Sequence, residues 1–76
     1  MKKLDYIKNN RGLKFVEIGM KVQFIYNGKF GIIKGGNSSG NLDVLFDGDK
    51  KPSNCHPTYK MRYFDSNDNV IAEYND

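Results

Sequence analysis

The sequence predicts an all-β fold in which five or six short antiparallel strands form a strongly bent sheet that closes into a small barrel. The length of 76 residues allows only one small domain. After Gly12, apolar and polar residues alternate with a period of two, which is typical of strands with one buried face. Turn-forming residue pairs separate these runs at short intervals. A meander without a helix is the alternative arrangement of the same strands.

The N-terminal segment is expected to differ from the rest of the chain. Residues 3–10 can form two turns of helix with Leu4 and Ile7 on one face. A helix this short is marginal unless it docks, so a frayed arm is the alternative. We therefore assign residues 1–12 to an N-terminal arm and residues 13–76 to the β-barrel domain.

The strands follow from residue 13 onward. Residues 13–18 change the phase of their alternation, so we expect a bulge or bend near Phe15 and Val16. Runs with one apolar face then occupy residues 21–24, 42–46, 59–63 and 70–74, and turns are expected at Asn27-Gly28, residues 35–40, Asp47-Gly48 and residues 65–69. Pro52 and Pro57 flank residues 53–56, which predicts an edge strand or an ordered loop. Because these connections are too short for a crossover, neighbouring strands must pair antiparallel.

Composition excludes several classes of protein. No stretch approaches the ~18 consecutive apolar residues of a membrane span, and residues 4–10 lack the apolar run of a secretory signal. The single cysteine, Cys55, cannot form an intrachain disulfide. We expect a cytoplasmic protein with no membrane partner. Its abundance of Lys, Asn, Ile and Tyr, which AT-rich codons encode, indicates a low-GC bacterium or one of its phages.

Catalytic and metal-binding patterns are incomplete. Cys55 and His56 are neighbours on an extended segment, so their side chains should point to opposite faces instead of forming a catalytic dyad. Zinc usually takes four ligands, and the chain has no second Cys or His. Residues 35–40 lack the Lys and Ser or Thr of a phosphate loop, and residues 65–69 resemble a calcium loop in which Val70 replaces the required glycine. We predict a protein that is not an enzyme and has no metal site or cofactor.

Basic residues concentrate in the first half of the chain. Residues 1–38 carry eight basic and two acidic residues, a net charge of +6, whereas residues 39–76 carry four and seven, a net charge of −3. Lysines beside aromatic rings suit single-stranded nucleic acid, because rings stack on bases while ammonium groups contact phosphates. The candidate binding residues are Lys21, Tyr26, Lys29, Phe30 and Lys34, with Tyr59, Lys60 and Arg62 as a second patch. The alternative is that Phe30 fills the core and the lysines solubilise edge strands.

Three runs resemble a known family. They are Gly19-Met20-Lys21-Val22-Gln23-Phe24, Gly28-Lys29-Phe30-Gly31-Ile32-Ile33 and Val44-Leu45-Phe46, and they are similar to the KOW-type, SH3-like barrels of ribosomal proteins and transcription elongation factors. Gly31 stands at the characteristic glycine of that pattern, where a close backbone approach or a positive φ would exclude a Cβ. The resemblance implies an SH3-like barrel that binds RNA or proteins.

These observations predict a non-enzymatic binding module for nucleic acid or a nucleoprotein partner. The alternative function is a small regulator or inhibitor, encoded by a phage, that binds a host protein through an exposed sheet edge or aromatic patch. An edge strand could also pair two copies of the chain into a homodimer.

Overall fold

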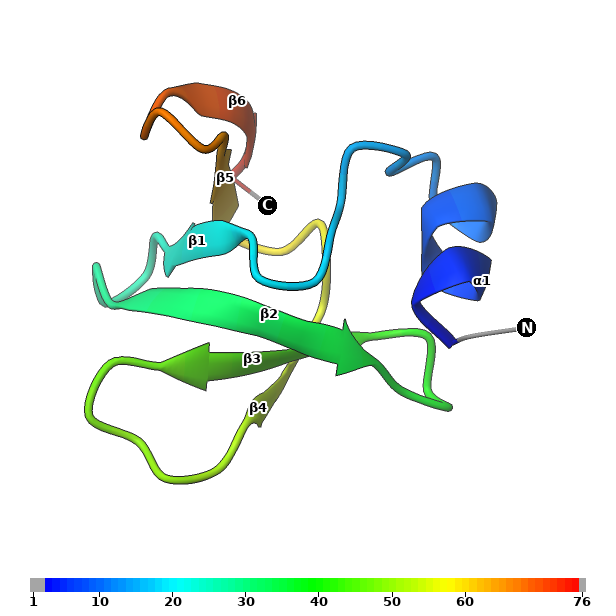
Figure 1. The fold of residues 1–76 in the computed structure, drawn as a ribbon, viewed down its shortest axis with the longest axis horizontal. Helices are drawn as coiled ribbons and strands as arrows, with labels where there is room; N and C mark the ends of the chain where they lie inside the picture. Colours follow the sequence, from blue (N-terminus) through cyan, green and yellow to red (C-terminus); the bar gives the residue numbers. More distant parts are fainter. Residues whose placement is uncertain (1–2, 76) are drawn as a thin grey trace.

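One helix and six strands make up the computed structural model, which describes residues 3–75 (Figure 1). The elements are α1 (Lys3–Asn10), β1 (Lys21–Phe24), β2 (Phe30–Gly36), β3 (Leu42–Phe46), β4 (Ser53–Cys55), β5 (Met61–Phe64) and β6 (Val70–Tyr74). The prediction of a mostly β fold with antiparallel strands is confirmed. In this part of the chain, no helix has the length and apolar character needed to cross a membrane.

All six strands belong to one antiparallel sheet with the order β4-β3-β2-β1-β5-β6. The first four strands follow one another as a meander, and the chain then returns so that β5 pairs with β1. The edge strands β4 and β6 do not pair with each other, so the sheet is open and does not form the closed barrel expected from the sequence. The sheet is strongly curved, and the whole molecule measures 30 × 26 × 24 Å (Figure 1). Figure 1 shows β5 and β6 rising steeply from β2 and β3.

The turns expected at Asn27-Gly28, Asp47-Gly48 and residues 65–69 form, whereas the turn expected at residues 35–40 is confined to its second half because β2 extends to Gly36. Gly28 in the Asn27-Gly28 turn has a φ of +75°, and Gly48 in the Asp47-Gly48 turn has a φ of +87°. Residues with a side chain rarely adopt this left-handed region, which explains the glycine in each pair. The segment between the two prolines forms the short edge strand β4.

Residues 13–18 form a turn and not a strand. The Val16 N–H donates to the Leu13 carbonyl at 3.1 Å, and both side chains are buried in the core. This is the expected bend near Phe15 and Val16. The alternation of apolar residues changes phase here because a loop, and not a strand, contributes Leu13 and Val16 to the core. The sheet has its bulges elsewhere, at Lys34 in β2 and at Ile71 in β6, where the pairing register skips one residue.

The core lies between the concave face of the sheet, the loop before β1, and α1. The fully or nearly fully buried apolar residues of this cluster are Leu4, Ile7, Leu13, Val16, Val22, Ile33, Leu42, Val44, Phe46, Met61 and Tyr63. The helix docks on the end of β2 because Gly36 has no side chain there: a Cβ would lie 2.6 Å from Ile7 Cδ1 and 2.9 Å from the Leu4 nitrogen. Residues 3–10 therefore form a docked helix and not a frayed arm.

Gly31 is required by packing. Its φ is not positive, but a Cβ would lie 2.7 Å from Val44 Cγ1, 2.9 Å from Phe46 Cδ1 and 3.0 Å from the Leu45 carbonyl oxygen. Of the two reasons predicted for this glycine, close approach of β3 is the one that applies.

Candidate functional site

The structure distributes the eight predicted binding residues over three places. Tyr26, Lys29, Tyr59 and Lys60 lie at one end of the sheet, in the β1–β2 turn and the β4–β5 loop; Lys21, Phe30 and Arg62 project from the outward face of β1, β2 and β5; and Lys34 lies at the bulge of β2. The predicted residues therefore do not form one continuous site.

The first place is a groove built from aromatic rings. Phe24 lies at its centre, and its ring centroid is 6.0 Å from that of Tyr26, 6.3 Å from that of Tyr59 and 6.4 Å from that of Phe46. We call this surface, together with Lys29, the aromatic groove. It includes a cavity of about 460 Å³ that Phe24, Phe46, Tyr59 and Lys29 line, and Tyr26 lies beside this cavity on the Phe24 ring. Tyr26 is 76% exposed and Tyr59 48% exposed, so two of the four rings are available to a ligand.

Local structure fixes the position of these rings. Phe24 and Phe46 end β1 and β3, which places them side by side at the same end of the sheet. The loop that carries Tyr59 is held by the Tyr63 hydroxyl, which donates to the Pro57 carbonyl at 2.5 Å. The Ile25 N–H donates to the Lys60 carbonyl at 2.8 Å and ties this loop to the β1–β2 turn. The loop that carries Tyr59 is therefore held by one side-chain and one main-chain hydrogen bond.

Cations surround the groove. Among residues 3–75, no carboxylate lies within ion-pair distance of the exposed Lys29 ammonium. Lys50 and Lys51 are exposed in the loop between β3 and β4, which reaches the groove through Asp49. The Lys60 ammonium lies 5.8 Å from the Tyr59 ring and donates to the Asn75 carbonyl at 3.3 Å.

Cys55 and His56 also line the groove. Burial, and to a smaller extent the charge of Asp43, raises the pKa of the Cys55 thiol to about 11. The thiol is therefore protonated at neutral pH, whereas nucleophilic cysteines react as thiolates. The His56 ring is engaged elsewhere: the Thr58 N–H donates to Nδ1 at 3.2 Å, and Nη1 of Arg11 lies 3.3 Å from Nε2.

On the outward face of the sheet, Lys21 interacts with other side chains of the protein. The Lys21 ammonium lies 4.6 Å from the centroid of the Phe30 ring and 5.1 Å from that of Phe64, and it pairs with Asp68 at 3.3 Å. Phe30 is 37% exposed and lies outside the core cluster. The alternative that Phe30 fills the core is therefore wrong, because it packs on the opposite face with Phe64, 5.8 Å away.

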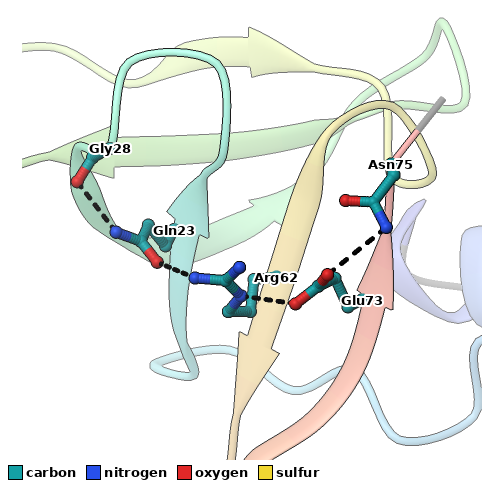
Figure 2. A network of polar contacts seen from close by, with 5 residues as sticks. All are labelled: Gln23, Gly28, Arg62, Glu73 and Asn75. Carbon is teal, nitrogen blue, oxygen red and sulfur yellow. Dashed lines mark hydrogen bonds and ion pairs between the residues drawn. The ribbon is translucent and has the colours of Figure 1, made fainter.

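Arg62 is part of a chain of polar contacts across three strands (Figure 2). It donates through Nη1 to Gln23 Oε1 at 2.7 Å and through Nε to Glu73 Oε1 at 2.7 Å. Gln23 in turn donates to the Gly28 carbonyl at 3.1 Å, and Asn75 donates to Glu73 Oε2 at 3.3 Å. The hydrogen bond from Arg62 lowers the pKa of Glu73. Arg62 thus joins β1, β5 and β6, and much of its donor capacity is used within the protein.

Lys34 lies apart from the groove. It is the extra residue at the β2 bulge, near the end of β2 on which α1 docks. Five residues of extended chain separate it from Lys29, about 16 Å at the usual rise per residue.

Sequence reasoning missed several residues that the fold brings to the groove. Phe24 and Phe46 were expected to face the core, and they do: Phe46 is buried in it and Phe24 packs against it, but both rings also line the groove. Asp49 and Asn54 were not singled out. The only local signal was their position next to predicted turns, where the ends of several strands could meet.

The segment that resembles the start of a calcium loop is a turn. The Asp65 Oδ1 accepts the N–H groups of Asn67 at 2.8 Å and Asn69 at 2.9 Å, which lowers the pKa of Asp65. Side-chain bonds of this kind are typical of turns.

Comparisons with protein-family models, with curated proteins and with solved structures return no match for this chain. The aromatic groove itself is therefore the basis for assigning a function.

Proposed function

We propose that this protein is a non-enzymatic module that binds single-stranded nucleic acid in the aromatic groove. The observation that carries the proposal is the pair Tyr26 and Tyr59, which are 76% and 48% exposed while both pack on Phe24. Exposed rings held by a partly buried ring offer stacking surfaces that lose little conformational freedom on binding.

The charges around the groove favour a phosphate backbone. Lys29, Lys50 and Lys51 are exposed at its border, and they can follow phosphates while bases stack on the tyrosines. The acidic groups of this region are Asp47 and Asp49, in the same loop as Lys50 and Lys51, and Asp43, whose charge acts on Cys55. Together with Lys60 beside the Tyr59 ring, four lysines face these three carboxylates. The local balance is therefore positive. Single strands fit better than a duplex, because stacked base pairs do not offer their faces to tyrosine rings.

The proposal narrows the set of binding residues. Lys21 and Arg62 are engaged with Asp68 and Glu73, so their charges are partly compensated before any ligand binds. The groove retains Tyr26 and Lys29 from the predicted hairpin and Tyr59 from the second patch, and Lys60 lies beside it, 5.8 Å from the Tyr59 ring.

We also propose that the curled sheet is an open form of the KOW-type, SH3-like barrel, acting in the cytoplasm. The support is the return of the chain that pairs β5 with β1 and the close packing at Gly31, the glycine through which the sequence resembles that family. Fold alone does not determine function, so the case for nucleic acid rests on the groove.

The test is fluorescence anisotropy with labelled RNA and DNA single strands of about ten nucleotides, within the usual span of small binding domains. Three phosphate contacts predict an affinity that falls about twentyfold between ~50 and ~200 mM salt. Tyr26→Ala and Tyr59→Ala should each weaken binding about fivefold or more, because stacking contributes ~1–3 kcal/mol per base.

Tyr6→Ala is the matched control. Tyr6 is 55% exposed on α1, at the other end of the sheet, and should leave the affinity unchanged. No binding at low salt, or full binding by both groove variants, would refute the proposal. Retention of a host protein after nuclease treatment, without affinity for either single strand, would favour the regulator or inhibitor instead.

A further inference from the structure

We propose that the aromatic groove holds one unpaired guanine base whose Watson–Crick edge is recognised by Asp49. This inference rests on the proposed function and specifies its ligand. The groove contains a carboxylate beside aromatic rings and lysines, and that combination constrains which part of a nucleotide can lie there.

The dimensions suit a single nucleotide. A volume of about 460 Å³ is within the ~300–1,000 Å³ of small-molecule sites, which accommodates a base with its sugar and not a stacked duplex. The rings that line this volume are Phe24, Phe46 and Tyr59, and the last two are inclined by 49° and 45° to the ring of Phe24. An inserted base therefore meets ring surfaces of different orientation, while Tyr26 packs on Phe24 beside the cavity.

Asp49 lies in a tight turn that fixes its backbone. Its N–H donates to the Phe46 carbonyl at 3.0 Å, directly after Gly48 with its φ of +87°. Within residues 3–75, neither an ion pair nor a hydrogen bond engages the Asp49 carboxylate. An ionised carboxylate only accepts hydrogen bonds and repels phosphate, so the ligand group beside it must be a donor.

Guanine provides the best match to such an acceptor. Its N1–H and N2–H₂ groups point in the same direction and can meet both carboxylate oxygens, as the fork of an arginine does. Adenine and cytosine each present a single amino group on this edge, and in uracil the N3–H lies between two carbonyl oxygens that a carboxylate repels.

The remaining polar groups of the groove are compatible with this orientation. Asn54 accepts a hydrogen bond from Asn37 through Oδ1 at 2.6 Å, which leaves its amide nitrogen as a donor for a carbonyl such as guanine O6. Lys29 lines the same groove and provides the cation for a flanking phosphate.

The experiment measures the affinity of the protein for RNA and DNA strands that differ only in their central base. The probes are a nine-residue oligouridine and the same strand with G, A, C or inosine at its centre, together with thymidine-based DNA equivalents. The strand with a central guanine should bind about five- to tenfold more tightly than oligouridine. This gain is at the lower end for a bidentate base contact, because Asp49 is exposed to solvent. Inosine lacks the N2 amino group and should lose most of this gain.

Asp49→Asn should remove the preference for guanine while leaving the affinity for oligouridine equal or higher. Asp47→Asn is the matched control, because Asp47 lies in the same loop but does not line the groove. Equal affinity for all five centres, or a preference for adenine or cytosine, would overturn this inference while the nucleic-acid function stands. Absence of binding to every probe at low salt would refute both.

Discussion

Replacing Gly31 with alanine tests the packing of β2 on β3. The new methyl group would lie 2.7 Å from Val44 Cγ1 and 3.0 Å from the Leu45 carbonyl oxygen. A side chain such as Val44 can rotate, but the backbone of β3 is hydrogen-bonded to β2 on one side and to β4 on the other. The sheet can therefore accommodate the methyl group only by shifting its strands.

The magnitude follows from two opposing effects. Overpacking of a tight site costs ~1–3 kcal/mol, whereas the loss of glycine freedom in the unfolded chain returns ~0.4–1 kcal/mol. The net loss of about 1–2 kcal/mol lowers Tm by about 5–15 °C, since each kcal/mol shifts the Tm of a domain of this size by about 4–8 °C.

The assay is thermal and urea unfolding followed by circular dichroism. Gly35→Ala is the control, because Gly35 lies in the same strand and an added Cβ there would meet no atom within 4 Å. Gly35→Ala also reduces the conformational freedom of the unfolded chain, but its methyl group does not clash with β3. The Tm of this variant should therefore equal or exceed that of the parent protein. Equal Tm values for the two variants would refute the packing argument.

Three further predictions concern titration and the β4–β5 loop. Alkylation of Cys55 should be slow at neutral pH and should accelerate up to a pH of about 11, because burial raises the pKa of the thiol to that value. Since the thiol of the unfolded chain has a pKa of 9.0, the free energy of unfolding should also decline as pH rises from 9.0 to about 11. An alkylation rate that levels off near pH 9.0 would contradict the burial argument. Tyr63→Phe removes the donor to the Pro57 carbonyl and should cost about 1 kcal/mol in urea unfolding; unchanged stability would show that this bond does not hold the loop. In an NMR titration the Glu73 carboxyl should have a pKa below its ordinary value, and Arg62→Gln should return this pKa towards normal. The contribution of Glu73 to stability should be complete above the ordinary pKa and should be lost as pH falls through the lowered pKa. Identical titration midpoints in the two proteins would exclude the ion pair.

The strands could be predicted because their signal is local. Leu42, Val44 and Phe46 alternate with more exposed neighbours and are all buried, as the period of two requires. The docking of α1 was left open, because it depends on Gly36 at the far end of β2. Nothing in residues 3–10 themselves indicates that a glycine 26 positions after the helix leaves room for it.

The candidate site could be predicted only in part, since its residues come together through the sheet order. The sequence identified Tyr26 and Tyr59 as candidate ligand-binding aromatics, but not Phe24, the ring on which both pack. Phe24 alternates in phase with the buried Val22, so periodicity assigns both to the core. The exposed rings become neighbours because the chain returns to pair β5 with β1, a long-range pairing that local patterns do not specify.

The sheet order also explains why the basic half of the chain does not become one basic face. β1 and β2, from the basic half, occupy the centre of the sheet, with β3 and β4 on one side and β5 and β6 on the other. Acids from the second half therefore reach the central lysines, as Asp68 reaches Lys21. Within residues 3–75, the loop lysines Lys29, Lys50 and Lys51 make no ion pair. A ligand attracted by charge should for this reason bind at the end of the sheet that carries Lys29, and not across its outward face.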